Sequence, residues 1–141
     1  MDEYSGTVIR DGPRFVGIQL YAPLPPTLNQ TYKPFRVGEQ CRIRLGTEAR
    51  NWKLATETYV RCLLNEQDVR PSVADLYSVT AVQYLRKDTR DADANVKLAM
   101  DAVFGGFGFH DRRVRRVVLE KRVDRAVTSY LSILVTVMDD G

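Results

Sequence analysis

The sequence has only one histidine, His110, and only two cysteines, Cys41 and Cys62. The cysteines lack metal-type spacing with each other and with the histidine, so the pattern does not predict a Cys/His zinc site. A single histidine also argues against Ser-His-Asp catalysis. We expect both cysteines to be free thiols in a reducing cytoplasm.

Long apolar runs and targeting segments are missing as well. No window approaches the length of a membrane span, and the first residues, Met1 to Tyr4, are neither basic nor apolar. A chain of 141 residues with 44% hydrophobic and 28% charged residues is typical of one globular domain. The sequence therefore predicts a cytoplasmic domain over residues 1–141, with residues 1–14 as an N-terminal extension and no membrane partner.

The positive charge is unevenly placed. Of 21 basic residues, 11 lie between Arg86 and Arg125, around an acidic stretch, while the net charge is only +3. Such a distribution favours a polyanion such as nucleic acid. The alternative is an ordinary mixed-charge exposed strand.

Hydrophobic periodicity predicts strands over 4–10, 15–21, 76–86, 114–123 and 127–138, and helices over 48–65 and 93–104. The strand over 127–138 is the more apolar of the last two and is expected to be central. Residues 4–10 could instead form a loose arm. Asp11-Gly12-Pro13 predicts a turn, 33–46 a basic loop or small hairpin, and Val123 to Ala126 a tight turn. The first helix is expected to bury the stripe Trp52, Ala55, Tyr59, Cys62 and Leu63. The order predicts an α+β domain with a four-stranded mixed sheet and two main helices on one face.

The stretch from Arg90 to Phe104 stands out chemically. Asp91 and Asp93 are two residues apart at the expected end of a strand, where period-2 geometry would point both side chains to one side. Asp93 is a candidate N-cap for the following helix. That helix has the apolar stripe Val96, Ala99, Met100, Val103 and Phe104.

Charged residues border this second helix. Lys97 and Asp101 lie at the edge of its stripe, and with Asp93 they could simply form an exposed i, i+4, i+8 charge ladder. Glycines after Phe104 are expected to end the helix, so that Asp111 could reach back only if the loop folds along the helix.

Two motifs resemble the RusA family of Holliday-junction resolvases. The family's proline segment, P-x-P-P-S/T-x-N-x-x-Y, is matched by Pro23, Pro25, Pro26, Thr27, Asn29 and Tyr32. Its acidic signature, D-x-D-N-x-x-K-x-x-x-D-A, is matched by Asp91, Asp93, Lys97, Asp101 and Ala102, followed by Asp111. The resemblance spans the run from Pro23 to Val123.

This sequence departs from the family pattern at two places. Ala94 stands where the family has asparagine, with Asn95 one place later. His110-Asp111 stands where the family often has two acids, so His110 is either a substitute or a surface group.

The resemblance implies a magnesium-dependent, structure-selective endonuclease that acts on branched DNA as a symmetric homodimer. Asp91, Asp93 and Asp111 would bind Mg²⁺, or Mn²⁺ in its place, and these acids with Lys97 would be catalytic. Asp101 and Asn95 would support them. No nucleotide cofactor is expected, because GxxxxGK[ST] is absent.

The chemistry is consistent with that implication, because Mg²⁺ prefers oxygen ligands and crowded carboxylates are costly without a cation. The residues expected to contact DNA are Asn29, Tyr32, Arg90, Arg112, Arg113, Arg115 and Arg116. A non-catalytic DNA- or RNA-binding module on the same basic surface, with Tyr32, Phe107 and Phe109 for stacking, is the alternative. A metal-nucleotide Asp-x-Asp site of the glycosyltransferase type is a third, more distant one.

Overall fold

The computed structural model describes residues 3–26, 32–38 and 40–139. For residues 32–35, 37 and 41–45 it describes the backbone and not the side chains. Its elements follow in chain order: β1 (Ser5–Asp11), β2 (Arg14–Ala22), β3 (Tyr32–Val37), β4 (Gln40–Leu45), α2 (Thr47–Gln67), β5 (Leu76–Leu85), α3 (Val96–Phe107), a short 3₁₀ turn (Asp111–Arg113), β6 (Val114–Val123) and β7 (Tyr130–Met138).

The main sheet is mixed and has five strands in the order β1-β2-β7-β5-β6. Strands β5 and β6 are parallel, and the other neighbours are antiparallel. The α+β prediction is confirmed, with one strand more than the expected four. The additional strand is the N-terminal segment, because β1 pairs with β2 through a turn in which Gly12 has a φ of 58°.

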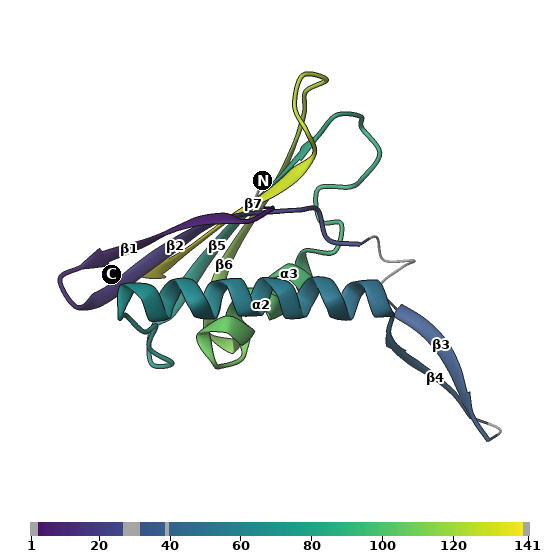
Figure 1. Ribbon diagram of the computed structural model, residues 1–141, viewed down its shortest axis with the longest axis horizontal. Coiled ribbons are helices and arrows are strands. Elements are labelled where there is room, and N and C mark those ends of the chain that lie inside the picture. The colour runs from purple at the N-terminus through teal and green to yellow at the C-terminus, as the bar shows by residue number, and fades with distance from the viewer. Residues whose placement is uncertain (1–2, 27–31, 39, 140–141) are drawn as a thin grey trace.

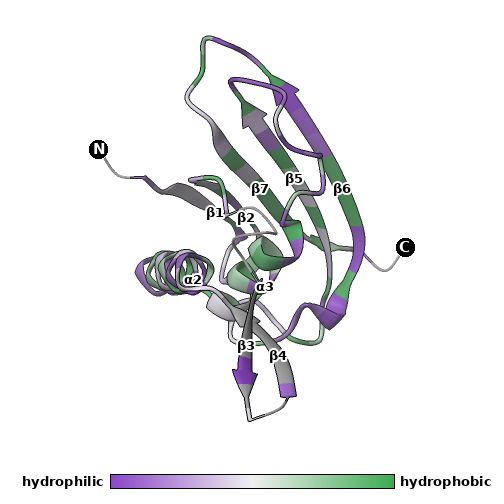
Figure 2. Ribbon diagram, turned by 90° about the vertical axis from the view of Figure 1, so that its right-hand side faces the viewer, coloured by the Kyte–Doolittle hydropathy of each residue, from purple (hydrophilic) through white to green (hydrophobic). Residues whose placement is uncertain are grey.

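Both helices pack on the same face of this sheet, and β3 and β4 form a separate hairpin that projects away from it (Figures 1 and 2). The hydrophobic core lies between the sheet and the helices, where Tyr77 and Phe104 meet edge-to-face with ring centroids 5.5 Å apart. Such aromatic pairs add stabilisation beyond the area that they bury. The core therefore fixes α3 against β5.

Helix α2 buries a stripe that agrees only in part with the expected one: Trp52 is buried, and Tyr59 and Leu63 pack partly against the core. Its buried residues are Ala49, Trp52, Thr56, Val60 and Leu64. Ala55 and Cys62 are exposed, and the Cys62 thiol is free. A threonine can occupy a core position here because the Thr56 hydroxyl donates a hydrogen bond to the Trp52 carbonyl, at 2.8 Å.

The last two strands of the chain are not neighbours. A turn forms between them one residue later than predicted, with the Val127 N–H bonded to the Asp124 carbonyl at 3.3 Å, and β7 begins at Tyr130 and not at the expected Val127. The two strands do not pair, because β5 lies between β6 and β7. Strand β7 is central, as its apolar sequence predicts, and β6 is an edge strand with mostly exposed side chains. The parallel pair β5 and β6 is therefore connected through α3, which makes a β-α-β unit.

Membrane insertion through a helix has no candidate among the described residues, because none of their helices combines the necessary length and apolarity.

Candidate active site

The acidic stretch does not continue strand β5, which corrects the sequence-based expectation. The strand ends at Leu85, and Ala92 to Asn95 form turns before α3 begins. The Gln83 side chain explains this shape, because its Nε2 donates to the carbonyls of Asp91 and Ala92 at 2.9 and 3.0 Å. Asp91 and Asp93 therefore lie on a turn, with exposed side chains, and not on one side of a strand.

The N-cap of α3 is Asn95 and not Asp93. Asn95 has a φ of 57°, a left-handed conformation that asparagine tolerates better than most residues. Its Nδ2 donates to the Pro26 carbonyl at 2.6 Å, and the side chain is buried. Arg90 adds a second link, because its Nη1 donates to the Pro25 carbonyl at 2.6 Å. The proline segment and the acidic turn are thus held together.

Helix α3 continues beyond the expected end at Phe104, through two glycines to Phe107. It ends at Gly108, whose φ of 96° closes the helix with hydrogen bonds to the carbonyls of Phe104 and Gly105. Glycine is tolerated inside the helix because α2 approaches closely there: a Cβ on Gly106 would lie 2.7 Å from Val60. The chain then turns back and brings Asp111 alongside the helix.

Lys97 is the centre of the assembled cluster. Its Nζ lies 2.5 Å from Asp111 Oδ2 and 2.9 Å from Asp101 Oδ1. The hydrogen bond that Lys97 donates to Asp111 is the main cause that raises the pKa of Lys97; partial burial opposes it and Asp101 adds to it. Lys97 therefore stays positively charged between two carboxylates.

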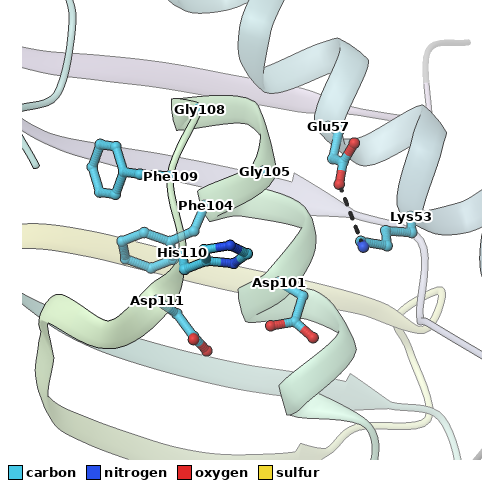
Figure 3. A pocket seen from close by; sticks show the side chains of 9 residues that line it. All are labelled: Lys53, Glu57, Asp101, Phe104, Gly105, Gly108, Phe109, His110 and Asp111. Carbon is cyan, nitrogen blue, oxygen red and sulfur yellow. Dashed lines mark ion pairs between the residues drawn. The ribbon is translucent and has the colours of Figure 1, made fainter.

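An open pocket of about 510 Å³ lies beside this cluster (Figure 3). Asp101 and Asp111 point into it from one side, and α2 lines it with Lys53 and Glu57, which form an i, i+4 ion pair at 3.8 Å. His110 lines the same pocket and is exposed. A charged group of a ligand could thus reach the carboxylates from solvent.

Asp91 and Asp93 do not join the lysine cluster. The pKa of Lys121 is raised mainly by the hydrogen bond that it donates to Asp88, at 2.6 Å, and to a smaller extent by the charge of Asp91. Lys121 also donates to the Arg90 carbonyl at 3.2 Å. Among the described residues, no three or more His, Cys, Asp or Glu side chains form a group that could hold a metal ion.

The residues expected to contact DNA have different environments. Arg112, Arg115 and Arg116 are exposed near the start of β6. Arg113 donates to the carbonyls of Ala74 and Asp75, at 2.8 and 3.3 Å, so it ties the turn before β5 to the start of β6.

The other three expected DNA contacts lie in the proline segment and the acidic turn. Burial lowers the pKa of Arg90, whose guanidinium contacts the proline segment. Asn29 lies outside the described residues, and Tyr32 begins β3, where the description covers the backbone.

Gln83 was not among the expected site residues. It is fully buried, and its Oε1 accepts no hydrogen bond from the described residues. Most buried polar atoms have a partner, so an amide oxygen without one beneath the acidic turn calls for an explanation. The available signal was a glutamine at a core-facing position of an otherwise apolar strand.

The comparisons with known proteins leave the family of the chain open: no family model matches it, and no curated protein does.

Proposed function

We propose that this protein is a Mg²⁺-dependent, structure-selective endonuclease that resolves branched DNA, including Holliday junctions, by paired nicks in opposing strands. The observation that carries the proposal is the Lys97 cluster. The fold brings Asp111, which follows α3 in the chain, into contact with Lys97. Lys97 lies in the first turn of that helix, shortly after Asp91 and Asp93 in sequence. One acid from within this helix and one acid from beyond its C-terminal end thereby contact the same cation.

The donor chemistry suits Mg²⁺. This ion prefers oxygen ligands and keeps several waters, so one or two carboxylates together with substrate phosphate are enough. Asp111, Asp91 and Asp93 would hold it, although they do not form one group in the arrangement described above. The Gln83 Oε1 atom adds a buried oxygen acceptor under the acidic turn. When bound, the ion would supply a more acidic water and neutralise charge on the phosphate.

Lys97 has a defined role in the proposed hydrolysis. Its ammonium group is held by Asp101 and Asp111, and more than half of its side chain is exposed. A fixed positive charge that faces solvent can stabilise the negative charge that builds on a phosphate during in-line attack. Asp101 acts as a positioning residue, because it contacts the lysine at the next helical turn.

The remaining parts of the proposal concern the assembly. Two nicks in opposing strands of a two-fold junction require two sites related by a dyad, which a symmetric homodimer provides. The exposed arginines at the start of β6, Arg112, Arg115 and Arg116, are suited to phosphate contacts. We place this activity in the cytoplasm of a bacterial cell or of a phage-infected cell.

Cleavage of a synthetic four-way junction in Mg²⁺ tests the proposal. We expect the wild-type protein to nick it symmetrically, whereas Asp93→Asn and Asp111→Asn abolish nicking and leave junction binding largely intact. Asp68→Asn is the matched control, since Asp68 is exposed at the far end of α2 in a left-handed conformation that asparagine accepts. Full nicking by Asp93→Asn would reject the assigned site.

Metal binding has a readout that does not depend on cleavage. Titration of the protein with Mn²⁺, followed by electron paramagnetic resonance, is expected to show a bound ion that Asp111→Asn weakens by tenfold or more, a loss of about 1.4 kcal/mol. Equal Mn²⁺ affinity in wild type and variant would remove Asp111 from the ligand set.

The alternative is a nucleic-acid-binding module without catalysis. One observation favours it: the Lys97 ammonium group already pairs with both Asp101 and Asp111, so these two carboxylates have a cationic partner within the protein. Wild-type protein that binds junctions but never cuts them, with Mg²⁺ or Mn²⁺ supplied, would support this reading.

A further inference from the structure

A row of aromatic side chains crosses the face of the sheet that faces away from the helices. The rings of Tyr84 and Tyr130 stack with centroids 4.6 Å apart and planes at 14°. Tyr21 continues the row, with its ring centroid 6.0 Å from that of Tyr130. At the other end the Arg122 guanidinium lies over the Tyr84 ring, 5.8 Å from its centroid.

The strand register explains why these residues meet. Tyr84 of β5 pairs with Tyr130 of β7 on one side and with Arg122 of β6 on the other. Tyr21 of β2 pairs with Ser132, so it is the diagonal neighbour of Tyr130. Residues from the strands β2, β7, β5 and β6 therefore form one continuous row.

The row faces away from the core. The residues next to its members in sequence, Leu20, Leu85 and Leu131, are fully buried on the helix side. Because strand side chains alternate, the tyrosines point to the opposite face, on which the described part of the chain places neither a helix nor a strand (Figure 2). Tyr21 is 41% exposed.

Two open pockets at this end of the sheet share Ser129 as a lining residue. One, of about 420 Å³, is mainly apolar and is lined by Tyr21 and Tyr130 together with Pro23, Thr128, Ser129 and one acid, Glu3. The other, of about 730 Å³, is lined by Arg86, Lys87, Thr89, Arg125 and Ser129, with no acid among these described residues. Aromatic and basic surfaces thus lie side by side.

This combination matches the chemistry of a nucleotide chain that is not base-paired. Every base offers a flat face that stacks on an aromatic ring, and every linkage carries a negative phosphate. Sheet faces that bear aromatic residues bind single-stranded nucleic acid in this way in unrelated folds. Gln19 and Ser132 lie next to the tyrosines on the same face of the sheet, and the Gln19 side chain donates a hydrogen bond to the Ser132 hydroxyl at 2.9 Å. These polar neighbours favour a polar ligand of this kind over a lipid surface.

We propose that the tyrosine row and the basic pocket beside it form a binding site for unpaired nucleotides. Bases would stack on Tyr21 and Tyr130, and phosphates would contact Arg86, Lys87 and Arg125. The site is on the sheet face opposite α3, and it does not depend on the proposed hydrolysis at Lys97. A branched DNA with an unpaired strand could occupy both sites.

Binding is tested in EDTA, so that cleavage cannot interfere, with ten-nucleotide DNA and RNA oligomers that contain the fluorescent base 2-aminopurine. We expect the wild-type protein to quench this fluorescence on binding either oligomer. Tyr130→Phe keeps the ring and should bind like wild type, while Tyr130→Leu should weaken binding about fivefold or more. Arg86→Ala combined with Arg125→Ala should weaken it similarly; Arg50→Ala, which removes an exposed charge from α2, should have a much smaller effect.

Thermal unfolding followed by circular dichroism establishes that each variant is folded. If Tyr130→Leu does not fold, Tyr21→Leu serves instead, because Tyr21 is substantially exposed. Three results would overturn the proposal: unchanged binding by the leucine variants, equal competition by duplex DNA at the same nucleotide concentration, or tighter binding to vesicles with anionic headgroups than to the oligomers. None of these results depends on whether the Lys97 cluster cuts DNA.

Discussion

Lys97 and Asp111 are 14 residues apart in sequence, and their side chains meet at 2.5 Å. The contact spans helix α3, because Lys97 lies in its first turn and Asp111 follows its C-terminal loop. Asp111 is the less exposed of the two, with 18% of its side chain accessible against 63% for Lys97. The pair therefore fixes the path of the returning loop and presents a positive charge to solvent.

Replacing Asp111 with asparagine should lower the pKa of Lys97 toward its ordinary value. The hydrogen bond that Lys97 donates to Asp111 is the largest cause of the raised pKa, so its loss leaves partial burial and Asp101 to act on the ammonium group. Titration of the lysine side-chain resonances by NMR measures the change. Asp101→Asn should lower the same pKa by less, and a larger effect from Asp101→Asn would contradict the assigned order.

A methyl group should be tolerated at Gly105 and not at Gly106. On Gly106 a Cβ would lie 2.7 Å from the Val60 side chain and 3.0 Å from the Glu57 carbonyl, between two packed helices. Overpacking of this kind costs about 1–3 kcal/mol. On Gly105 its nearest neighbours would be atoms of the Glu57 side chain, which can move aside, and alanine has the better helix propensity, by up to about 1 kcal/mol.

Urea unfolding of Gly105→Ala and Gly106→Ala distinguishes these two positions. Equal stability of both variants would show that α2 and α3 are not in close contact at Gly106.

Substitutions at Asn95 should separate its backbone role from its side-chain role. Asn95→Gly keeps access to the left-handed φ and loses the bond to the Pro26 carbonyl. Asn95→Ala loses both, so we expect it to be less stable than Asn95→Gly by about 1 kcal/mol, the cost of this conformation for an ordinary residue. Chemical denaturation measures the difference, and a more stable alanine variant would refute the backbone argument.

Tyr77 should make the protein less stable at high pH. Burial, and secondarily the charge of Asp75, raises its pKa from 10.0 to about 12. Between these values the folded protein keeps the phenol proton and the unfolded chain loses it, so ionisation favours unfolding as pH rises. The slope for one such group is at most about 1.4 kcal/mol per pH unit.

The measurement is the difference in unfolding free energy between wild type and Tyr77→Phe. It should be constant below about pH 10, the ordinary tyrosine pKa, and should shrink as pH rises toward 12, since the other titrating groups are common to both proteins. The phenylalanine variant also lacks the hydrogen bond to the Ser72 carbonyl, at 2.6 Å, which sets the constant part. A difference that does not change with pH would refute the assignment.

Local pattern predicted the elements well where one physical cause dominated. The apolar stripe of α3 is correct: Val96, Ala99, Val103 and Phe104 are buried, and Met100 packs partly against them. The stripe of α2 was right at Trp52 and wrong at Ala55 and Cys62, which are exposed. Thr56 satisfies its hydroxyl within the helix and with Tyr4, at 2.9 Å, and so takes a core position. Polarity alone could not reveal that arrangement.

The conformation of the turn that contains Asp91 and Asp93 could not be predicted from local sequence either. Asp91 and Asp93 follow a strand in sequence, but Gln83, Asn95 and the proline segment bend the chain through hydrogen bonds that no local pattern encodes. Similarly, β6 and β7 follow one another in sequence and are separated in the sheet by β5.

By itself the sequence determined the α+β class, the strands and helices, the central position of β7 and the choice of Lys97, Asp101 and Asp111 as residues of interest. Periodicity and charge are local properties, and they can be read one segment at a time. Only the tertiary structure decided that Lys97 contacts Asp111, that Asp91 acts on Lys121, and that Tyr21, Tyr130 and Tyr84 form a row. These contacts depend on strand order and register, which are set by the burial of a shared core.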